Sequence, residues 1–272
     1  MRRFPLVVST PGRLLPGGLL LVSLLLVSLL LGSLLSAAAT AADLQIAVTD
    51  SLTPPVVPEA GRTRITGLCW AGADTLALLV ARRDSLDLAR GEQVFLVVGD
   101  TTGTVYWQEE FTDVLHRGLA WDGEFFWSAG DDAEGGSLLY KIKADTVRVE
   151  EVHPAPGHRP MSLAFDGRWL WVSDRDSGRL DRIDPETGQL TRTASPPGFS
   201  PVGLAWDGRA MWLTDAGTGR LARLRGGRLD RQDLVEAADW FLRGADVLLA
   251  HDGQHLWMLR PDDRVLRRLE RP

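Results

Sequence analysis

Four stretches of the chain share one pattern, and this pattern decides the fold. They are Gly118-Leu-Ala-Trp-Asp-Gly-Glu-Phe-Phe-Trp127, Ser162-Leu-Ala-Phe-Asp-Gly-Arg-Trp-Leu-Trp171, Gly203-Leu-Ala-Trp-Asp-Gly-Arg-Ala-Met-Trp212 and Leu248-Leu-Ala-His-Asp-Gly-Gln-His-Leu-Trp257. Each has Asp-Gly at the same place and a Trp five residues after the Asp, and the four Asp residues are 44, 41 and 45 residues apart. A degraded fifth copy, Gly67-Leu-Cys-Trp-Ala-Gly72, lies upstream. Repetition at this period in strand-like segments predicts the blades of a β-propeller.

The Asp-Gly pairs predict where each blade turns. Asp-Gly favours the centre of a two-residue type I′ hairpin turn, because both central positions need a positive φ. This turn sets a register in which a large indole faces a small residue in three copies. The expected pairs are Trp127 with Gly118, Trp171 with Ser162 and Trp212 with Gly203, whereas the last copy sets Trp257 against Leu248.

The number of repeats predicts the whole architecture. In the complete units a third and a fourth strand follow the Trp strand, but the last unit has only three strands before Pro272. The segment from Leu44 to Thr49 alternates as a strand should and can supply the missing one. We therefore expect residues 43–272 to form an all-β domain, a single five-bladed propeller with four-stranded antiparallel blades and a ring closed by an N-terminal strand.

Residues 1–42 have the features of a secretory signal peptide. Three arginines precede an apolar run of 17 residues, Leu19 to Leu35, and the small residues Ala39 to Ala41 offer a cleavage site. An uncleaved membrane anchor is the alternative, since the run is just short of the ~20 residues that span a bilayer. We expect a periplasmic or secreted protein that contacts a membrane only through an uncleaved N-terminal segment.

The net charge bears on possible partners, and the cysteine count bears on how the fold is held together. The net charge of −6 becomes −9 without residues 1–41, which disfavours nucleic acid as a partner. Cys69 is the single cysteine and cannot form an internal disulfide, so packing must hold the fold together.

The repeat resembles a known class of propellers. Gly-Leu-Ala-Trp-Asp-Gly, a Trp strand ending in Ser173-Asp174 or Thr214-Asp215, and then Gly-Arg-Leu are similar to the repeats of NHL and SMP-30/gluconolactonase-like propellers, over roughly residues 65 to 260. With its five predicted blades, the domain also resembles the plant-type glutaminyl cyclases. These resemblances imply the architecture, but propeller repeats occur across unrelated functions.

Candidate site residues follow from the propeller topology, because no sequence motif of a common enzyme class is present. Propeller ligands usually lie at the mouth of the central channel, lined by the segments before the innermost strands and the loops after the second strands. The first group comprises His116, Arg117, His158, Arg159, Ser200, Arg243 and Asp246. The second comprises Asp131, Asp174, Asp215 and Arg260, together with the charged loop Arg82 to Glu92. His116-Arg117 and His158-Arg159 are expected at equivalent positions of successive blades, where they would suit an anionic ligand.

Several of these residues also have a structural interpretation. Asp174 and Asp215 can bind backbone amides of their own turns, or they can belong to a ring of carboxylates around a divalent metal. The Asp of each Asp-Gly turn and most tryptophans are expected to be structural, with Trp169 and Trp240 outside the regular positions. His251, which replaces a Trp or Phe, is expected to be packed. No cofactor is indicated, and the divalent metal stays an open alternative.

Three functions remain open at this stage, besides a purely structural role. The first is a non-catalytic module that binds a protein, peptide or small ligand at the channel mouth. The second is a metal-dependent enzyme of the lactonase or lyase type, which the complete lack of Asn in the chain disfavours. The third is a glutaminyl-peptide cyclotransferase, suggested by the number of blades.

Overall fold

The computed structural model describes residues 45–52, 62–83, 92–111, 115–131, 134–196, 200–215, 219–225, 232–237, 246–261 and 265–270. The predicted signal segment, most of the loop between Arg82 and Glu92, Trp240 and Arg243 lie outside these ranges. All described residues belong to one compact unit, Leu44–Pro272. Within the described ranges, no helix is long and apolar enough to cross a membrane.

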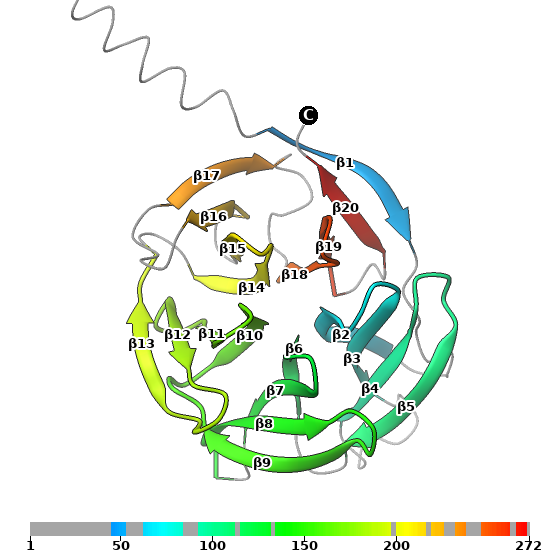
Figure 1. Cartoon of the computed structure of the whole chain (residues 1–272), viewed down its shortest axis with the longest axis vertical. Coiled ribbons are helices and arrows are strands. Elements are labelled where there is room, and N and C mark those ends of the chain that lie inside the picture. The colour runs from blue at the N-terminus through cyan, green and yellow to red at the C-terminus, as the bar shows by residue number, and fades with distance from the viewer. Residues whose placement is uncertain are drawn as a thin grey trace, which may run out of the picture. The chain divides into compact units, whose positions relative to one another are not determined.

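The described residues form five four-stranded antiparallel blades, so the predicted five-bladed β-propeller is confirmed (Figure 1). Blade 1 contains β2 (Arg62–Trp70), β3 (Thr75–Arg83), β4 (Glu92–Asp100) and β5 (Val105–Phe111). Blade 2 contains β6 (Arg117–Trp121), β7 (Phe125–Asp131), β8 (Ser137–Lys143) and β9 (Arg148–Pro154). Blade 3 contains β10 (Pro160–Phe165), β11 (Leu170–Asp174), β12 (Arg179–Ile183) and β13 (Leu190–Ala194). Blade 4 contains β14 (Pro201–Trp206), β15 (Ala210–Asp215), β16 (Leu221–Arg225) and β17 (Gln232–Ala237).

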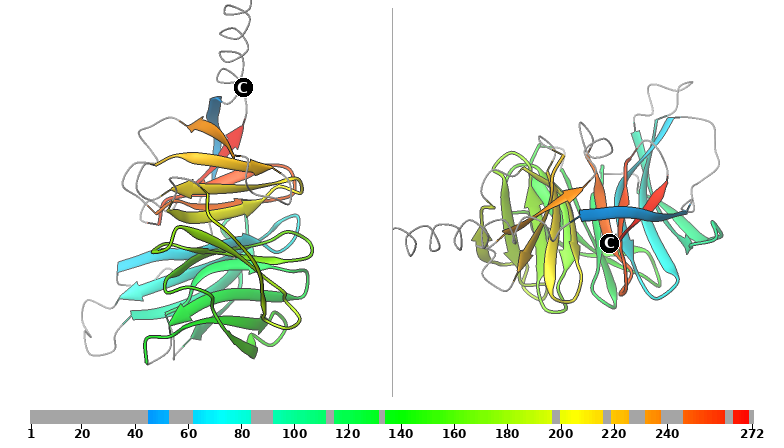
Figure 2. Two further views of the ribbon diagram at one scale, coloured as in Figure 1. Left: turned by 90° about the vertical axis from the view of Figure 1, so that its left-hand side faces the viewer. Right: turned by 90° about the horizontal axis from the view of Figure 1, so that it is seen from above.

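Blade 5 joins the two ends of the domain, as predicted. Its strands β18 (Leu248–His251), β19 (Leu256–Leu259) and β20 (Leu266–Glu270) are completed by β1 (Gln45–Leu52). β1 runs antiparallel to β20 and, at Gln45 and Ile46, also pairs in parallel with β17 of blade 4. Figure 2 shows the blue β1 beside the red β20, with the orange β17 at its end. β1 therefore closes the ring by pairing with blade 5, and it covers a strand edge that would otherwise be exposed.

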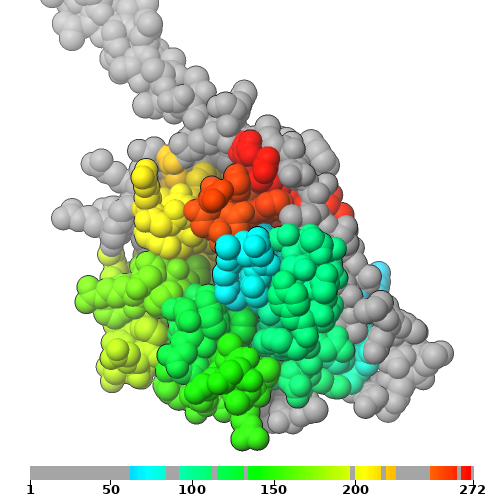
Figure 3. All heavy atoms as spheres, turned by 45° about the vertical axis from the view of Figure 1, so that its right-hand side comes forward, coloured from blue at the N-terminus to red at the C-terminus, as the bar shows by residue number. Residues whose placement is uncertain are grey.

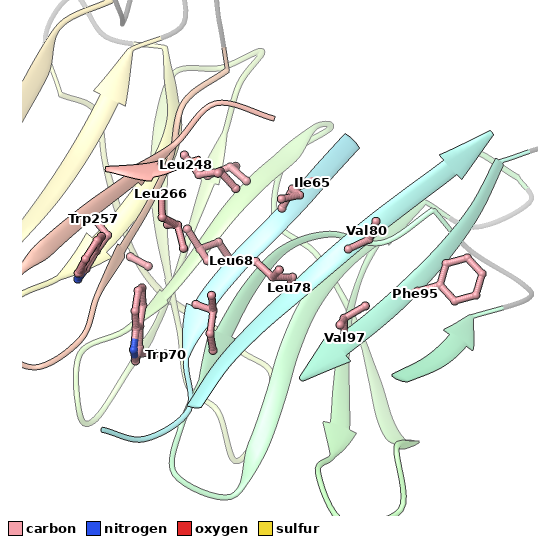
Figure 4. Packing of buried hydrophobic residues seen from close by; sticks show 13 residues of the cluster. Ile65, Leu68, Trp70, Leu78, Val80, Phe95, Val97, Leu248, Trp257 and Leu266 are labelled. Carbon is pink, nitrogen blue, oxygen red and sulfur yellow. The ribbon is translucent and has the colours of Figure 1, made fainter. Parts of the chain in front are cut away.

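The core lies between neighbouring blades. Both faces of the inner strands are apolar, and β3 is buried along almost its whole length. Figure 4 shows the cluster between blades 1 and 5, where Trp70 and Trp257 stack with ring centroids 5.6 Å apart. Cys69 is buried in the neighbouring cluster between blades 1 and 2, and burial raises the pKa of its thiol far above the ordinary value. It is therefore a packing residue rather than a reactive thiol.

The predicted register of the inner hairpins is wrong: the turn centre lies one residue later than predicted, so the partner of each repeat Trp shifts by two residues. Each repeat Trp faces an alanine: the pairs are Trp127 with Ala120, Trp171 with Ala164, Trp212 with Ala205 and Trp257 with Ala250. The cause is the turn type. In blade 2 the amide of Asp122 donates to the carbonyl of Phe125 at 3.1 Å, so Gly123 and Glu124 are the central residues. Gly123, with φ of 108°, occupies the first central position, as in a type II′ turn.

The turn Asp is fixed by a second interaction, with the repeat Trp. One carboxylate oxygen of Asp122 accepts the amides of Glu124 and Phe125, at 2.9 and 2.7 Å. The other oxygen accepts the indole N–H of Trp127 at 2.7 Å. The same indole bond recurs in blades 3, 4 and 5 at 2.7 to 2.8 Å. This bond explains the constant spacing of five residues, and the predicted structural role of these Asp residues is confirmed.

Candidate functional site

The residues predicted to bind a ligand lie at one end of the channel. The innermost strands β2, β6, β10, β14 and β18 surround the centre and all begin at this end (Figure 1). Each second strand is antiparallel to its innermost strand, so the loops that follow the second strands return to the same end. We call this end the strand-start mouth.

Asp174 and Asp215 are used by the fold at this mouth. One oxygen of Asp174 accepts the amides of His158 and Arg159, at 2.8 and 2.7 Å. The other accepts the amide and the hydroxyl of Ser177, at 2.8 and 2.6 Å. Burial by itself raises the pKa of Asp174, but these hydrogen bonds outweigh it, and the pKa is lowered overall. Asp215 likewise accepts the amide of Ser200 at 2.5 Å. Each carboxylate therefore holds the segment that leads into the innermost strand of its own blade.

His116 lies in the core and not on the rim. Its side chain is 3% exposed between the rings of Phe111 and Tyr140, with centroids 4.2 and 4.7 Å away. Its Nδ1 forms a hydrogen bond with the hydroxyl of Ser128 at 2.7 Å. Burial lowers the pKa of His116 to about 4, so the imidazole is neutral at pH 7.

The predicted equivalence of His116 and His158 is wrong. The repeat tryptophans of blades 2 and 3 are 44 residues apart, whereas the two histidines are 42 apart. The two histidines differ in their distance from the innermost strand. His116 directly precedes β6, whereas His158 lies two residues before the start of β10. His158 is accordingly exposed while His116 is buried.

The remaining predicted residues form a surface of paired charges. Arg117 forms an ion pair with Asp131. Arg175, a residue that the sequence analysis did not select, lies after β11 of blade 3 and pairs at 2.8 Å with Asp246, which precedes β18 of blade 5. Exposed Arg159 lies 3.9 Å from Asp176, and Arg260 is partly exposed. Each of these pairs is partly exposed, so each contributes little to stability and can exchange partners.

The opposite end of the channel has a different chemistry. The innermost strands end there in five aromatic side chains, one from each blade: Trp70, Trp121, Phe165, Trp206 and His251. We call this end the aromatic mouth. These residues line a cavity of about 80 Å³, whose deeper walls are the preceding Ala or Cys and Leu residues of the same strands. The volume is enough for two water molecules or one small side chain.

A larger cavity lies beside the aromatic mouth, between blades 4 and 5. We call it the blade 4–5 groove; its volume is about 640 Å³, and its lining includes Arg209, Ala210, Arg223 and His251. Figure 3 shows the orange atoms of blade 5 directly beside the yellow atoms of blade 4. His251 lines both this groove and the channel cavity. Sequence reasoning missed both cavities, although the departure of His251 from the repeat pointed to them.

The metal alternative finds no assembled ligand set in the part of the chain that the structure describes. No group of three or more His, Cys, Asp or Glu side chains is close enough there to hold an ion. Asp174 and Asp215 are instead surrounded by amide and hydroxyl donors of the chain.

Comparisons with known proteins identify the fold alone. No protein-family model matches the chain, and no curated protein sequence does. Among solved structures, Myxococcus xanthus glutaminyl cyclase is similar with 13% identity and a TM-score of 0.62, over 84% of this chain and 96% of that one. A chain of a nidogen/laminin complex is similar with 15% identity and a TM-score of 0.52, over 72% of each chain. The resemblance to NHL and SMP-30 repeats is not confirmed by these comparisons.

Proposed function

We propose that this protein is an exported, non-catalytic binding module that holds part of a protein, peptide or small ligand in its aromatic mouth. The observation that carries the proposal is the channel cavity, to which all five blades contribute one aromatic side chain each. The strand-start mouth is the weaker candidate, because its charged side chains already have partners within the chain.

The aromatic mouth has the properties of a preformed apolar site. Trp121, Phe165, Trp206 and His251 are partly exposed, whereas the leucines below them are buried. A small apolar group that enters this cavity would gain about 1.5 to 3 kcal/mol from its own burial. Since the rim residues belong to strands of a closed ring, little conformational entropy is lost on binding.

The lining of this cavity favours binding over catalysis. Among the described residues that line it, the titratable side chains are Cys69 and His251. Burial raises the pKa of the Cys69 thiol and lowers the pKa of His251. The Nδ1 of His251 also accepts the amide of Gly253 at 3.1 Å. The nearby turn carboxylates, of which Asp252 is the closest in sequence, are bonded to amides and an indole.

Glutaminyl-peptide cyclisation is the second candidate, and it is favoured by the similarity to a glutaminyl cyclase over 96% of that protein. In this reaction the α-amine of an N-terminal Gln attacks its own side-chain amide, the new C–N bond forms, and ammonia leaves. A group must pass a proton from the amine to the departing nitrogen. In the aromatic mouth, His251 is the side chain that supports such a role.

Binding is tested by comparing rim variants with a variant of the other mouth. We expect a peptide array probed with the wild-type protein to give saturable binding that Phe165→Ala and Trp206→Ala abolish and Arg260→Ala preserves. Thermal unfolding first establishes which variants are folded at the assay temperature. If Trp206→Ala is not folded, Phe165→Ala alone decides the test. Loss of binding in Arg260→Ala with retention in Phe165→Ala would move the site to the strand-start mouth.

Two further measurements test the other parts of the proposal. Ammonia release from a peptide with N-terminal Gln, lost in His251→Phe, would replace the binding module with the cyclase. Export is tested by N-terminal sequencing of the protein recovered after expression. A start near residue 43 supports a cleaved signal peptide, whereas Met1 in a membrane fraction supports the anchor.

A further inference from the structure

Two departures from the repeat lie in the same groove. The third residue after each turn Asp is Phe125 in blade 2 and Trp169 in blade 3, but Ala210 in blade 4. The last residue of the innermost strand is Trp or Phe in four blades but His251 in blade 5. Ala210 and His251 belong to different repeats, yet both line the blade 4–5 groove.

In blades 2 and 3 the aromatic residue after the turn covers a cation. The ammonium of Lys141 lies 4.6 Å from the ring centroid of Phe125 and 5.5 Å from that of the repeat Trp127. The guanidinium of Arg182 lies 4.6 Å from the ring centroid of Trp169. Each cation is therefore enclosed by aromatic rings of its own blade.

Blade 4 keeps the cation and loses the ring. Arg223 lies 5.5 Å from the ring centroid of the repeat Trp212 and is 8% exposed, but Ala210 stands where the second ring would be. The corresponding groove between blades 2 and 3, which contains Phe125 and Phe165, has a volume of about 440 Å³ against about 640 Å³ here. The additional space thus lies beside a planar cation and an indole.

Three side chains around this space, those of Arg209, His251 and Gln254, offer hydrogen-bond donors. Arg209 is exposed at the turn, where blade 2 has Glu124 in its groove. The Nδ1 of His251 accepts the amide of Gly253, so the neutral ring carries its hydrogen on Nε2 and donates from there. The amide of Gln254 is a further donor in the lining.

The two carboxylates of the groove are already engaged. Asp207 accepts the amides of Arg209 and Ala210 and the indole N–H of Trp212. Glu270 forms an ion pair with Arg268 at 2.9 Å. The groove therefore offers cationic and N–H groups to a ligand, and its carboxylates face partners of the chain.

We propose that the blade 4–5 groove binds a small aromatic carboxylate. The aromatic ring of the ligand takes the space that Phe125 fills in blade 2, against Arg223 and Trp212, and its carboxylate accepts hydrogen bonds from Arg209. The proposal goes beyond binding at the aromatic mouth and does not require it, because Arg209 and Ala210 do not line the channel cavity.

The test is isothermal titration of the purified protein with benzoate, with benzamide and cyclohexanecarboxylate as probes that lack the charge and the planar ring. We expect saturable binding of benzoate that is about tenfold tighter than that of either control probe. Arg209→Gln should weaken benzoate binding about tenfold, whereas Arg168→Gln, the matching position of blade 3, should leave it unchanged. Ala210→Phe restores the ring of the other blades and should abolish binding.

Defined outcomes would overturn the proposal. They are equal affinity of the wild type and Arg209→Gln for benzoate, equal affinity for benzoate and benzamide, or no saturable binding of benzoate. The Arg209 and Arg168 variants decide the question even if Ala210→Phe does not fold, since both arginines are exposed. Phe165→Ala should leave benzoate binding intact, which separates a failure of this site from a failure of the aromatic mouth.

Discussion

Protonation of His116 should destabilise the propeller in a defined pH range. The imidazole is buried between Phe111 and Tyr140, and burial lowers its pKa from the ordinary 6.5 to about 4. Between these values the unfolded chain binds a proton that the folded protein does not. Stability is therefore complete above pH 6.5 and is lost as the pH falls toward 4. Integration of the shift gives a loss of about 3 kcal/mol between pH 7 and pH 4.

The assay is urea unfolding of the wild type and of His116→Phe at several pH values from 4 to 7. Phenylalanine fits between the two aromatic neighbours but leaves the hydroxyl of Ser128 without its partner, which should cost about 1 to 3 kcal/mol at pH 7. The wild type should lose about 3 kcal/mol more than the variant on acidification, so near pH 4 the variant should be as stable as the wild type or more stable. The lowered pKa of His251 affects both proteins equally and cancels in the difference.

Parallel stability curves for the two proteins would refute this reasoning. They would mean that His116 keeps its ordinary pKa in the folded protein, and hence that the aromatic enclosure does not exclude water from the imidazole. A wild type more stable at pH 4 than at pH 7 would contradict the sign as well.

Three other predictions concern packing, turns and metal. Gly203→Leu should destabilise the domain by about 3 kcal/mol or more in thermal unfolding, because even a Cβ there would clash with the carbonyl oxygen of Val247; unchanged melting would contradict it. Asp207→Ala removes the acceptor of the Trp212 indole and of two amides and should cost about 2 to 3 kcal/mol in urea unfolding, and a cost below about 0.5 kcal/mol would count against the repeat role of this bond. EDTA should not change the melting temperature, since both oxygens of Asp174 accept hydrogen bonds from the chain; a lower melting temperature after chelation would restore the metal alternative.

The sequence predicted the architecture because one unit recurs, but it did not predict how each unit turns. Asp-Gly has a strong preference for the centre of a type I′ turn. Asp122 instead stands before the centre, where its two oxygens bind amides of the turn and the indole of Trp127. The hydrogen bond between the Asp122 carboxylate and the Trp127 indole forms only in the folded hairpin, and it outweighs the local turn preference of Asp-Gly. The clash expected at Gly203 remains, although its partner is the backbone of blade 5 and not Trp212.

The candidate site, like the hairpin turns, was only partly predicted from the sequence. Topology correctly placed Arg117, Asp131, Arg159 and Asp246 at one mouth, but it could not show that the fold pairs their charges. It also treated His116 and His158 as equivalent, although they lie one and two residues before their innermost strands. The blade 4–5 groove lies between residues of different repeats, such as Ala210 of blade 4 and His251 of blade 5. Comparing equivalent positions of the repeats does not show that these two residues are neighbours.

The pairing of Gln45–Leu52 with Leu266–Glu270 also determines when the molecule can finish folding. During synthesis the first of these strands leaves the ribosome long before its partner, because the other blades lie between them in the chain. Until then blade 5 is incomplete and the ring stays open. Contacts this far apart in the chain form slowly, and unpaired strand edges are exposed in the meantime. A propeller with this closure cannot be completed until both strands have been synthesised, which keeps the earlier blades accessible to chaperones and to any machinery that handles unfolded polypeptide.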